Sequence, residues 1–174
     1  TLPGTYSAFN VNTNITIATW DQMGILSKEG NSNLAFNGSL FNNIGAFEVE
    51  PGSTGNVALL GGGQFNNNGL IITESDVSMA LTTHGPDGKI DVEQGTLSLL
   101  QDLTPAGAIH ISPGAVLSVG SGLTMTLNDG GLINGEGGTL ELFNSTLSIN
   151  GGALTIGDLS TRNLSRLNGN GVSS

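Results

Sequence analysis

The 174-residue sequence contains no cysteine, and only 10% of its residues are charged. Without cysteine the chain has no disulfide framework, thiol nucleophile or cysteine-based zinc site. Basic residues are especially scarce, with 4 against 14 acidic residues, which gives a net charge of -10. A surface of this charge repels phosphate groups, so we expect no nucleic-acid partner.

Long apolar runs are also missing. No stretch approaches the roughly 18 apolar residues of a membrane-spanning helix, so we expect no membrane insertion. The opening Thr-Leu-Pro-Gly lacks the basic and apolar regions of a signal peptide. The expectation is therefore a soluble domain, a mature form, or a piece of something longer.

Glycine, in contrast, is abundant, at 28 of 174 residues. It separates short segments in which apolar and polar residues alternate, most clearly between residues 88 and 156. Alternation with a period of two places every second side chain on one face of a β-strand. A strand of about five residues cannot bury that face alone, so successive units must stack. The pattern predicts an all-β chain coiled into a β-solenoid.

Recurring motifs indicate the length of one turn. The segment that begins at Phe41 recurs at Phe65, 24 residues later, and Gly-Thr-Leu-Ser-Leu at 95–99 returns as Gly-Thr-Leu-Glu-Leu at 138–142. Isoleucines recur at steps of 19, 19 and 24 residues, at Ile71, Ile90, Ile109 and Ile133. A turn of roughly 20 residues fits three short strands with corners between them.

Asparagine residues before Gly45 and Gly69 suit corners in the left-handed backbone conformation. Stacked asparagine side chains are also able to hydrogen-bond from turn to turn, as a ladder.

The clear repeats predict that the solenoid spans residues 34–157. Residues 1–33 are interpreted as an N-terminal capping or assembly segment, because an uncovered first turn would leave bare core and unpaired strand edges. Within it, a capping-box pattern from Thr19 predicts a short helix across Trp20 to Ser27. Residues 158–174 lose the alternation and are interpreted as an irregular tail, and residues 82–88 as a protruding turn.

The pattern Gly-X-Ile-X-Val-X-X-Gly-X-Leu-X-Leu, with Asn-Asn-X-Gly and Gly-Gly-Thr-Leu variants, resembles right-handed parallel β-helices of bacterial surface proteins. The likeness is to passenger domains of autotransporters and to haemagglutinin-type adhesins, over residues 34–157. It implies export, an extracellular or cell-surface location, and adhesion, self-association or a stalk. Because no C-terminal membrane barrel is visible in these 174 residues, we expect that they are not a whole autotransporter. Phage tailspikes, surface filaments and pectin-degrading enzymes share the same repeat pattern.

One group of polar residues is a candidate catalytic surface. Asp91 and Glu93 alternate with apolar residues, and His110 follows Asp91 by one turn, so a carboxylate and an imidazole are expected side by side on the outer face. Lys89 is the sole basic residue nearby. Pectin-degrading solenoids combine clustered carboxylates with calcium and a basic residue, and this scarcity of basic groups favours a solvated surface without catalysis.

Other motifs are each better explained without a ligand. His84 is expected to be an exposed loop residue, and Asn128-Asp129-Gly130 and Pro86-Asp87-Gly88 to be turns, although their oxygens would suit calcium. Gly135 to Leu140 lacks the aspartate of a calcium-binding nonapeptide repeat.

A single Thr-X-Thr at 124–126 makes no ice-binding row, and Gly61 to Gln64 lacks the Lys-Ser/Thr of a phosphate loop. We expect no metal and no cofactor. Glycosylation sequons begin at Asn14, Asn37, Asn144 and Asn163, and they matter only in a glycosylating host.

Together these observations favour a non-enzymatic, extracellular or cell-surface β-solenoid with a structural or adhesive role. Self-association through the solenoid ends, as in a fibre subunit, is the expected partnership. The alternatives are a spike or adhesin module that holds surface glycans, and a polysaccharide-degrading enzyme.

Overall fold

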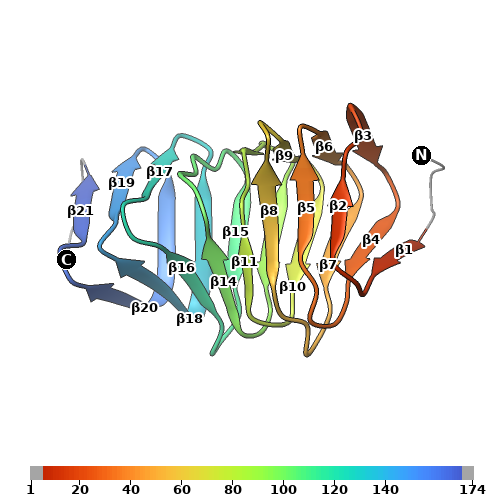
Figure 1. The fold of residues 1–174 in the computed structure, drawn as a ribbon. Coiled ribbons are helices and arrows are strands. Elements are labelled where there is room, and N and C mark those ends of the chain that lie inside the picture. Colours follow the sequence, from red (N-terminus) through yellow and green to blue (C-terminus); the bar gives the residue numbers. More distant parts are fainter. Residues whose placement is uncertain (1–5, 170–174) are drawn as a thin grey trace.

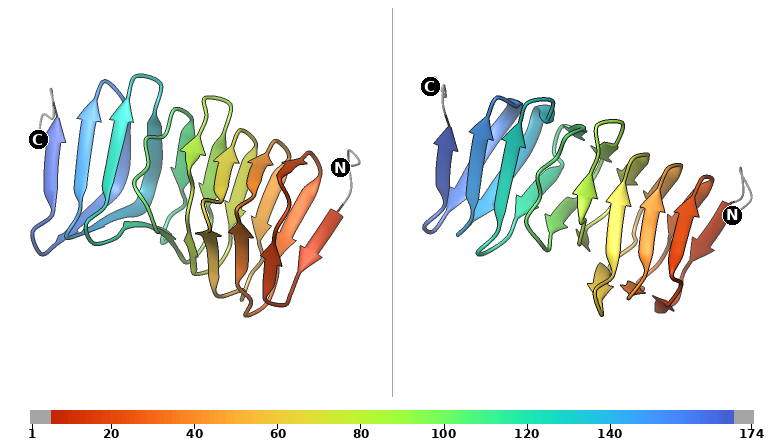
Figure 2. Two further views of the ribbon diagram at one scale, coloured as in Figure 1. Left: turned by 45° about the horizontal axis from the view of Figure 1, so that its top comes forward. Right: turned by 90° about the horizontal axis from the view of Figure 1, so that it is seen from above.

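In the computed structural model, which describes residues 6–169, the chain coils into a β-solenoid of about 8 turns (Figure 1). No helix occurs in these residues, and every pairing between named strands is parallel. The first and last turns lie at opposite ends of a column (Figure 2). The sequence-based prediction of an all-β solenoid with three strands per turn is therefore confirmed.

Three faces run along the column, and each turn contributes a strand to each face, except that the fifth turn has no strand on the third face. The first face contains β1 (Tyr6–Phe9), β4 (Ile25–Lys28), β7 (Ala46–Val49), β10 (Leu70–Thr73), β13 (Lys89–Val92), β15 (Ala108–Ile111) and the first parts of β18 (Leu132–Phe143) and β20 (Ala153–Arg162). The second face contains β2 (Thr13–Ile15), β5 (Leu34–Asn37), β8 (Asn56–Leu60), β11 (Val77–Met79), β14 (Thr96–Leu99), β16 (Val116–Val119) and the later parts of β18 and β20.

The third face is divided into two sheets. The first contains β3 (Thr19–Gln22), β6 (Leu40–Asn43), β9 (Gln64–Asn67) and β12 (Thr83–His84). The second contains β17 (Thr124–Asn128), β19 (Thr146–Asn150) and β21 (Arg166–Gly169). Between them, the fifth turn makes only two isolated bridges, His84 to Pro105 and Leu103 to Met125. Pro105 has no N–H to donate to a ladder, which fits the interruption at this point.

The repeats found in the sequence correspond to vertical neighbours. Phe41 pairs with Phe65, and the four isoleucines from Ile71 to Ile133 stack in register on the first face. Leu97 and Leu140 of the two Gly-Thr-Leu motifs share one stack, with Leu117 of the turn between them.

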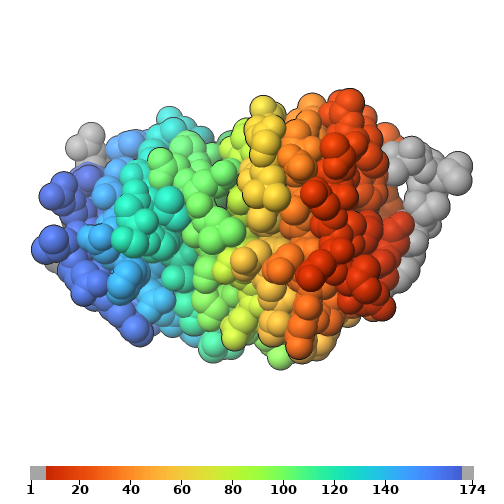
Figure 3. Space-filling model, viewed as in Figure 1, coloured from red at the N-terminus to blue at the C-terminus, as the bar shows by residue number. Residues whose placement is uncertain are grey.

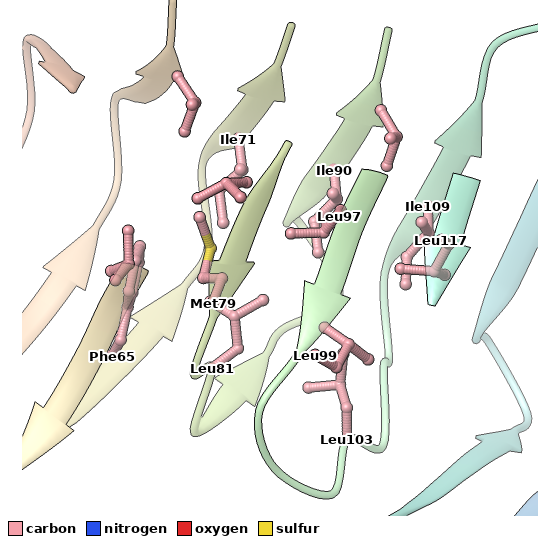
Figure 4. Close-up of a cluster of buried hydrophobic side chains, with 14 of the residues drawn as sticks. Phe65, Ile71, Met79, Leu81, Ile90, Leu97, Leu99, Leu103, Ile109 and Leu117 are labelled. Carbon is pink, nitrogen blue, oxygen red and sulfur yellow. The ribbon is translucent and has the colours of Figure 1, made fainter. Parts of the chain in front are cut away.

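Inward side chains fill the column. Those on the first and second faces meet in the interior, as Figure 4 shows for Ile90 opposite Leu97 and Ile109 near Leu117. All four of these side chains are fully buried. Phenylalanines gather in the first half, where Phe41 stacks on Phe36 with ring centroids 4.5 Å apart. Period-two alternation thus produces one continuous apolar core.

The predicted helix from Trp20 to Ser27 is wrong. This segment forms β3 and β4, which pair with β6 and β7. Trp20 and Leu26 stack on Phe41 and Phe47, so packing against the next turn overrides a local capping signal. The first described turn, residues 6–22, thus has the same three-strand layout as later turns, while residues 1–5 of the predicted segment lie outside the described part.

The irregular tail predicted for residues 158–174 is also corrected. Asp158 to Arg162 continue β20 along β18, and β21 pairs with β19. The alternation is hard to see in the sequence because most of these side chains are exposed, so few positions require an apolar residue. Residues 170–174 of this tail lie outside the described part.

The corners before Gly45 and Gly69 do not use left-handed asparagines. The left-handed non-glycine residues in the described chain are Asn144, at φ 48°, and Asn163, at φ 58°. Gly45 and Gly69 are required for another reason, because a Cβ there would overlap the backbone of the preceding turn.

Candidate functional site

The expected carboxylate–imidazole neighbours lie on the outer surface of the first face. Asp91 aligns with His110 on the adjacent strand. His110 is exposed, and its Nδ1 lies 3.0 Å from the carbonyl oxygen of Asn134, one turn further on. Within the described residues the ion pair present is elsewhere, between Arg162 Nε and Glu141 Oε1 at 3.0 Å. The alignment was predicted correctly, but the imidazole is held by a backbone group.

Four glutamates line the corner where the first face ends. Each follows the last residue of its strand in successive turns, and each backbone N–H bonds to the turn before: Glu29, Glu50, Glu74 and Glu93. Turns are about 4.8 Å apart, so these carboxylates form a vertical row of like charge. We call it the acidic row.

Glu48 lies beside this row on β7. Burial raises the pKa of the Glu48 carboxyl, and the negative charges of Glu50 and Glu74 raise it further. No group of three or more histidine, aspartate or glutamate residues in the described chain has the arrangement of a metal site. The row is a strongly negative ridge.

His84 is not the exposed loop residue that the sequence suggested. It belongs to β12 and is 1% exposed, because its strand pairs with β9 and its side chain points inward. The protruding turn expected at residues 82–88 is thus partly a strand, and only Pro86 and Asp87 follow as an exposed turn.

Four buried polar side chains occupy one inward position in successive turns of the third face. We call Gln22, Asn43, Asn67 and His84 the inner ladder. Asn43 Nδ2 donates to Asn67 Oδ1 at 2.7 Å, and Asn67 Nδ2 lies 3.1 Å from His84 Nδ1. Stacked asparagines were predicted to form a ladder, and they do.

Each member of the inner ladder also contacts the carbonyl oxygen of the first residue in a first-face strand, 22 to 27 residues further along the chain. The acceptors are Ala46, Leu70, Lys89 and Ala108, at 3.3, 2.8, 3.2 and 3.1 Å in that order. These bonds tie the third face of one turn to the first face of a later turn. The side chains therefore fasten a corner where backbone pairing changes face.

The hydrogen bonds determine the state of the His84 ring. Because Asn67 Nδ2 is a donor, Nδ1 of His84 must accept, and Nε2 carries the proton that is donated to Ala108. Burial lowers the pKa of His84, while the bond to Ala108 opposes this effect. The neutral ring is buried, and both of its nitrogens are bonded within the protein, so His84 has a structural role.

A second ladder stands outside the same strands. Asn42 Nδ2 donates to Asp21 Oδ1 at 2.8 Å, Asn66 Nδ2 donates to Asn42 Oδ1 at 3.1 Å, and Thr83 Oγ1 donates to Asn66 Oδ1 at 2.9 Å. We call these four residues the outer ladder. It runs parallel to the inner ladder; Asp21 and Thr83 at its ends are exposed, and Asn42 and Asn66 between them are half-buried.

Lys28 is a further buried group that the sequence did not indicate. Its side chain is fully buried at the end of β4, and Nζ donates to the carbonyl oxygen of Thr54 at 2.6 Å and to that of Gly30 at 3.4 Å. Burial lowers the pKa of the Lys28 ammonium. Its contacts are backbone carbonyls in a corner, which is a structural role.

The remaining sequence candidates lie on corners and outer surfaces. Thr124 and Thr126 of the Thr-X-Thr motif flank buried Met125, and above them stand Thr146 and Ser148, then Arg166 and Asn168. This is no threonine row. Asp129 and Asp87 are exposed, and Gly61 and Gly62 make a left-handed corner before β9.

The sequons occupy different environments. Asn14, Asn144 and Asn163 are exposed, whereas Asn37 is half-buried and the serine of its sequon, Ser39, is buried.

A shallow depression on the second face is lined by small polar side chains. It has a volume of about 360 Å³ and is lined in part by Asn56, Asp76, Ser78, Thr96 and Ser98. Aromatic side chains, the usual platforms for sugar rings, do not line it. Phe36, Phe41, Phe47 and Phe65 are all in the core.

At each end of the described column several inward residues are only partly buried, as Phe9 and Trp20 are in the first described turn. In the last turn Leu154 and Leu159 are half-buried, although Ile133 and Leu140, the residues below them, are fully buried. Leu167 is 41% exposed above the fully buried Leu147. Figure 3 shows these first and last turns at the extremities of the elongated molecule.

A scan against family models, a search of curated proteins and a search of solved structures each returned no match to this chain. Within the described residues there is no helix with the length and hydrophobicity needed to span a membrane.

Proposed function

We propose that this β-solenoid is a non-enzymatic structural or adhesive element that acts outside the cell or on its surface, and that it self-associates through its ends. The observation that supports this most is the accessible core at the end turns. Leu167 and Leu154 continue stacks whose preceding members are fully buried.

Two kinds of unsatisfied group coincide at these ends. Covering half-buried apolar side chains with a partner stabilises the complex by about 25 cal/mol per Å² of apolar surface buried. The outermost strands of the described column, such as β1 and β21, each pair with one neighbour only. Strand edges of this kind recruit further strands. A second copy stacked on an end would cover these apolar side chains and pair with the free strand edges.

The resemblance to bacterial surface solenoids supports the location. The repeat pattern that carries it lies in stacked strands, as that family implies. The absence of cysteine and the net charge of -10 are compatible with export and with a flank that resists lateral aggregation. The outer carboxylates lie next to backbone-bound His110 and beside like charges, which supports a non-catalytic surface.

Sedimentation velocity over a range of protein concentrations tests the association. We expect species that grow in whole multiples of 17.6 kDa, and elongated particles in electron micrographs. Leu167→Glu places a charge on the exposed end and should abolish the larger species. Leu60→Glu is the matched control, because Leu60 is 48% exposed on the side of the column.

A wild-type protein that stays monomeric at every concentration overturns this proposal. Equal loss of association in the Leu60 and Leu167 variants would overturn the end-to-end geometry, since it would indicate contact through the sides.

Glycan binding is the second candidate, and the depression near Asn56 and Ser78 favours it. Its hydroxyl, amide and carboxylate groups are able to hydrogen-bond sugars. Binding on a glycan array that is lost in Ser78→Tyr, which would fill the depression, would support this alternative.

A further inference from the structure

This inference rests on the proposed end-to-end association and gives it a direction. We propose that copies of this chain stack head to tail, so that the last described turn of one copy lies on the first described turn of the next. In this register β21 pairs with β3 in parallel, and the first part of β20 pairs with β1.

The polarity follows from the strands. Every named pairing in the column is parallel, and successive turns add in one direction. Placing a last turn against a first turn extends all three faces with the same parallel pattern. Two identical ends placed together would instead align strands antiparallel and bring unlike faces into contact, so the edges would not match.

The register follows from the inward positions. On the third face Phe41 and Asn43 stand above Trp20 and Gln22, and in the last turns Leu167 and Gly169 stand above Leu147 and Ile149. Aligning the two sets puts Leu167 on Trp20, both of which pack incompletely at their own end. Gly169 would then lie on Gln22 and leave its larger side chain room.

The first face gives a compatible register. Ile156 follows the inward stack of the first part of β18, and Phe9 occupies the inward position below Lys28. Both are partly buried and pack against the core. Placing Ile156 on Phe9 puts Thr155 beside Ala8 on the outer surface, because neighbouring residues alternate sides.

Charge and polarity complement each other in this arrangement. The last turn carries Arg162 and Arg166, half of the 4 basic residues of the chain, together with Asp158, and Arg162 is paired with Glu141. In the first described turn, residues 6–22, Asp21 is the charged residue. The register puts Asn168 next to Asp21, where it would continue the outer ladder, and Arg166 on the diagonal within side-chain reach. Two copies meeting by the same end would lack this match.

Single-cysteine variants test the proposal, because the natural chain has no cysteine. Ala8→Cys and Thr155→Cys are mixed under mild oxidation. Paired strands lie about 4.8 Å apart, which suits a disulfide. We expect the mixture to yield a covalent dimer at least tenfold faster than either variant alone. Thr155→Cys mixed with Thr19→Cys, whose sites are on different faces, is the control and should crosslink no faster than the single variants.

Each outcome is decisive. Rapid crosslinking of either variant alone, or equal rates for the matched and control mixtures, overturns head-to-tail stacking while leaving association itself intact. Absence of association in sedimentation for all variants and for the unmodified protein overturns the proposed function and this inference together.

Discussion

The two sheets of the third face use different chemistry in the same column. In the first sheet, aromatic rings fill the inward position of Phe41 and Phe65, and the inner ladder fills the position two residues later. In the second sheet the corresponding positions are aliphatic, as at Met125 and Leu127. The change occurs at Pro105, next to His84.

This difference shows that the inward positions of the third face accept either stacked rings and amides or stacked aliphatic side chains, and so require no particular residue type. Each turn places its residues directly above the equivalent residues of the turn before. Rings are therefore able to stack on rings, and amides to bond to amides. An amide above a leucine would lose its bonding partner. In the first sheet the buried amides form an uninterrupted run from Gln22 to Asn67, and the run ends in His84, which bonds to the backbone beyond it.

Truncating Phe41 is expected to have the largest effect. Its ring lies 4.8 Å from that of Phe65 and 5.3 Å from that of Trp20. Phe41→Ala should cost about 3–5 kcal/mol, because neighbouring rings on both sides cannot close the cavity. Leu147→Ala, at the corresponding position of the second sheet, should cost nearer ~2 kcal/mol, because partly exposed Leu167 above it is free to relax.

Hydrogen exchange measures these losses of stability turn by turn. This is the suitable method because the turns of a solenoid are able to open separately. Equal loss of protection around the two sites would contradict the contrast between the aromatic and aliphatic sheets.

Breaking the inner ladder should have the next largest effect. Asn67→Ala leaves His84 Nδ1 without a donor and takes one of the two acceptors of Asn43 Nδ2, which keeps its bond to Leu70, at about 2–3 kcal/mol in total. Asn66→Ala is the control, since it removes only outer-ladder bonds and should cost below ~1 kcal/mol. Chemical denaturation measures both. Comparable losses would mean that burial adds nothing to the ladder.

Much of the fold was predictable because the inward positions of each turn require apolar residues, which makes the repeat visible in the sequence. Ile71 to Ile133 align in the column as the sequence spacing indicated, and so do Phe41 and Phe65. The predictions of an irregular tail and of a helix were wrong where the apolar pattern is weak or a local signal competes with it. At the last turn Thr161 and Arg162 are exposed, so strands form without a visible apolar pattern. At Trp20, a capping signal matched by chance and the neighbouring turn decided the structure.

His84 could not be placed from the sequence for a different reason. A Thr-Thr-His-Gly-Pro segment has the composition of an exposed turn, and its strand is only two residues long. The signal that it is buried lies in Asn43 and Asn67, at the equivalent position in earlier turns. The asparagine repeat was recognised, but the histidine was not identified as its next member. Alignment by position rather than by residue type would have found it.

The smallest predicted effect is a dependence of stability on pH that arises from His84 of the inner ladder. Burial lowers the pKa of His84 in the folded protein, whereas the unfolded imidazole takes up its proton near pH ~6.5. The unfolded state therefore binds more protons below that pH. The free energy of unfolding should be independent of this group above the unfolded pKa and should fall as the pH drops below it.

His84→Gln and His110→Gln separate this effect from the titration of carboxylates. The first should reduce the loss of stability between pH 7.5 and 5.5, because glutamine binds no proton. It should also be less stable than the natural protein at pH 7.5, because its shape fits the two bonds to Asn67 and Ala108 less well. The second is the control for removal of an exposed imidazole, and it should cost less stability at pH 7.5 than the first, since this ring is held only by the Asn134 carbonyl. An unchanged pH profile in His84→Gln would show that this ring stays neutral in both states and that the ladder's contribution to stability is purely one of packing and hydrogen bonding.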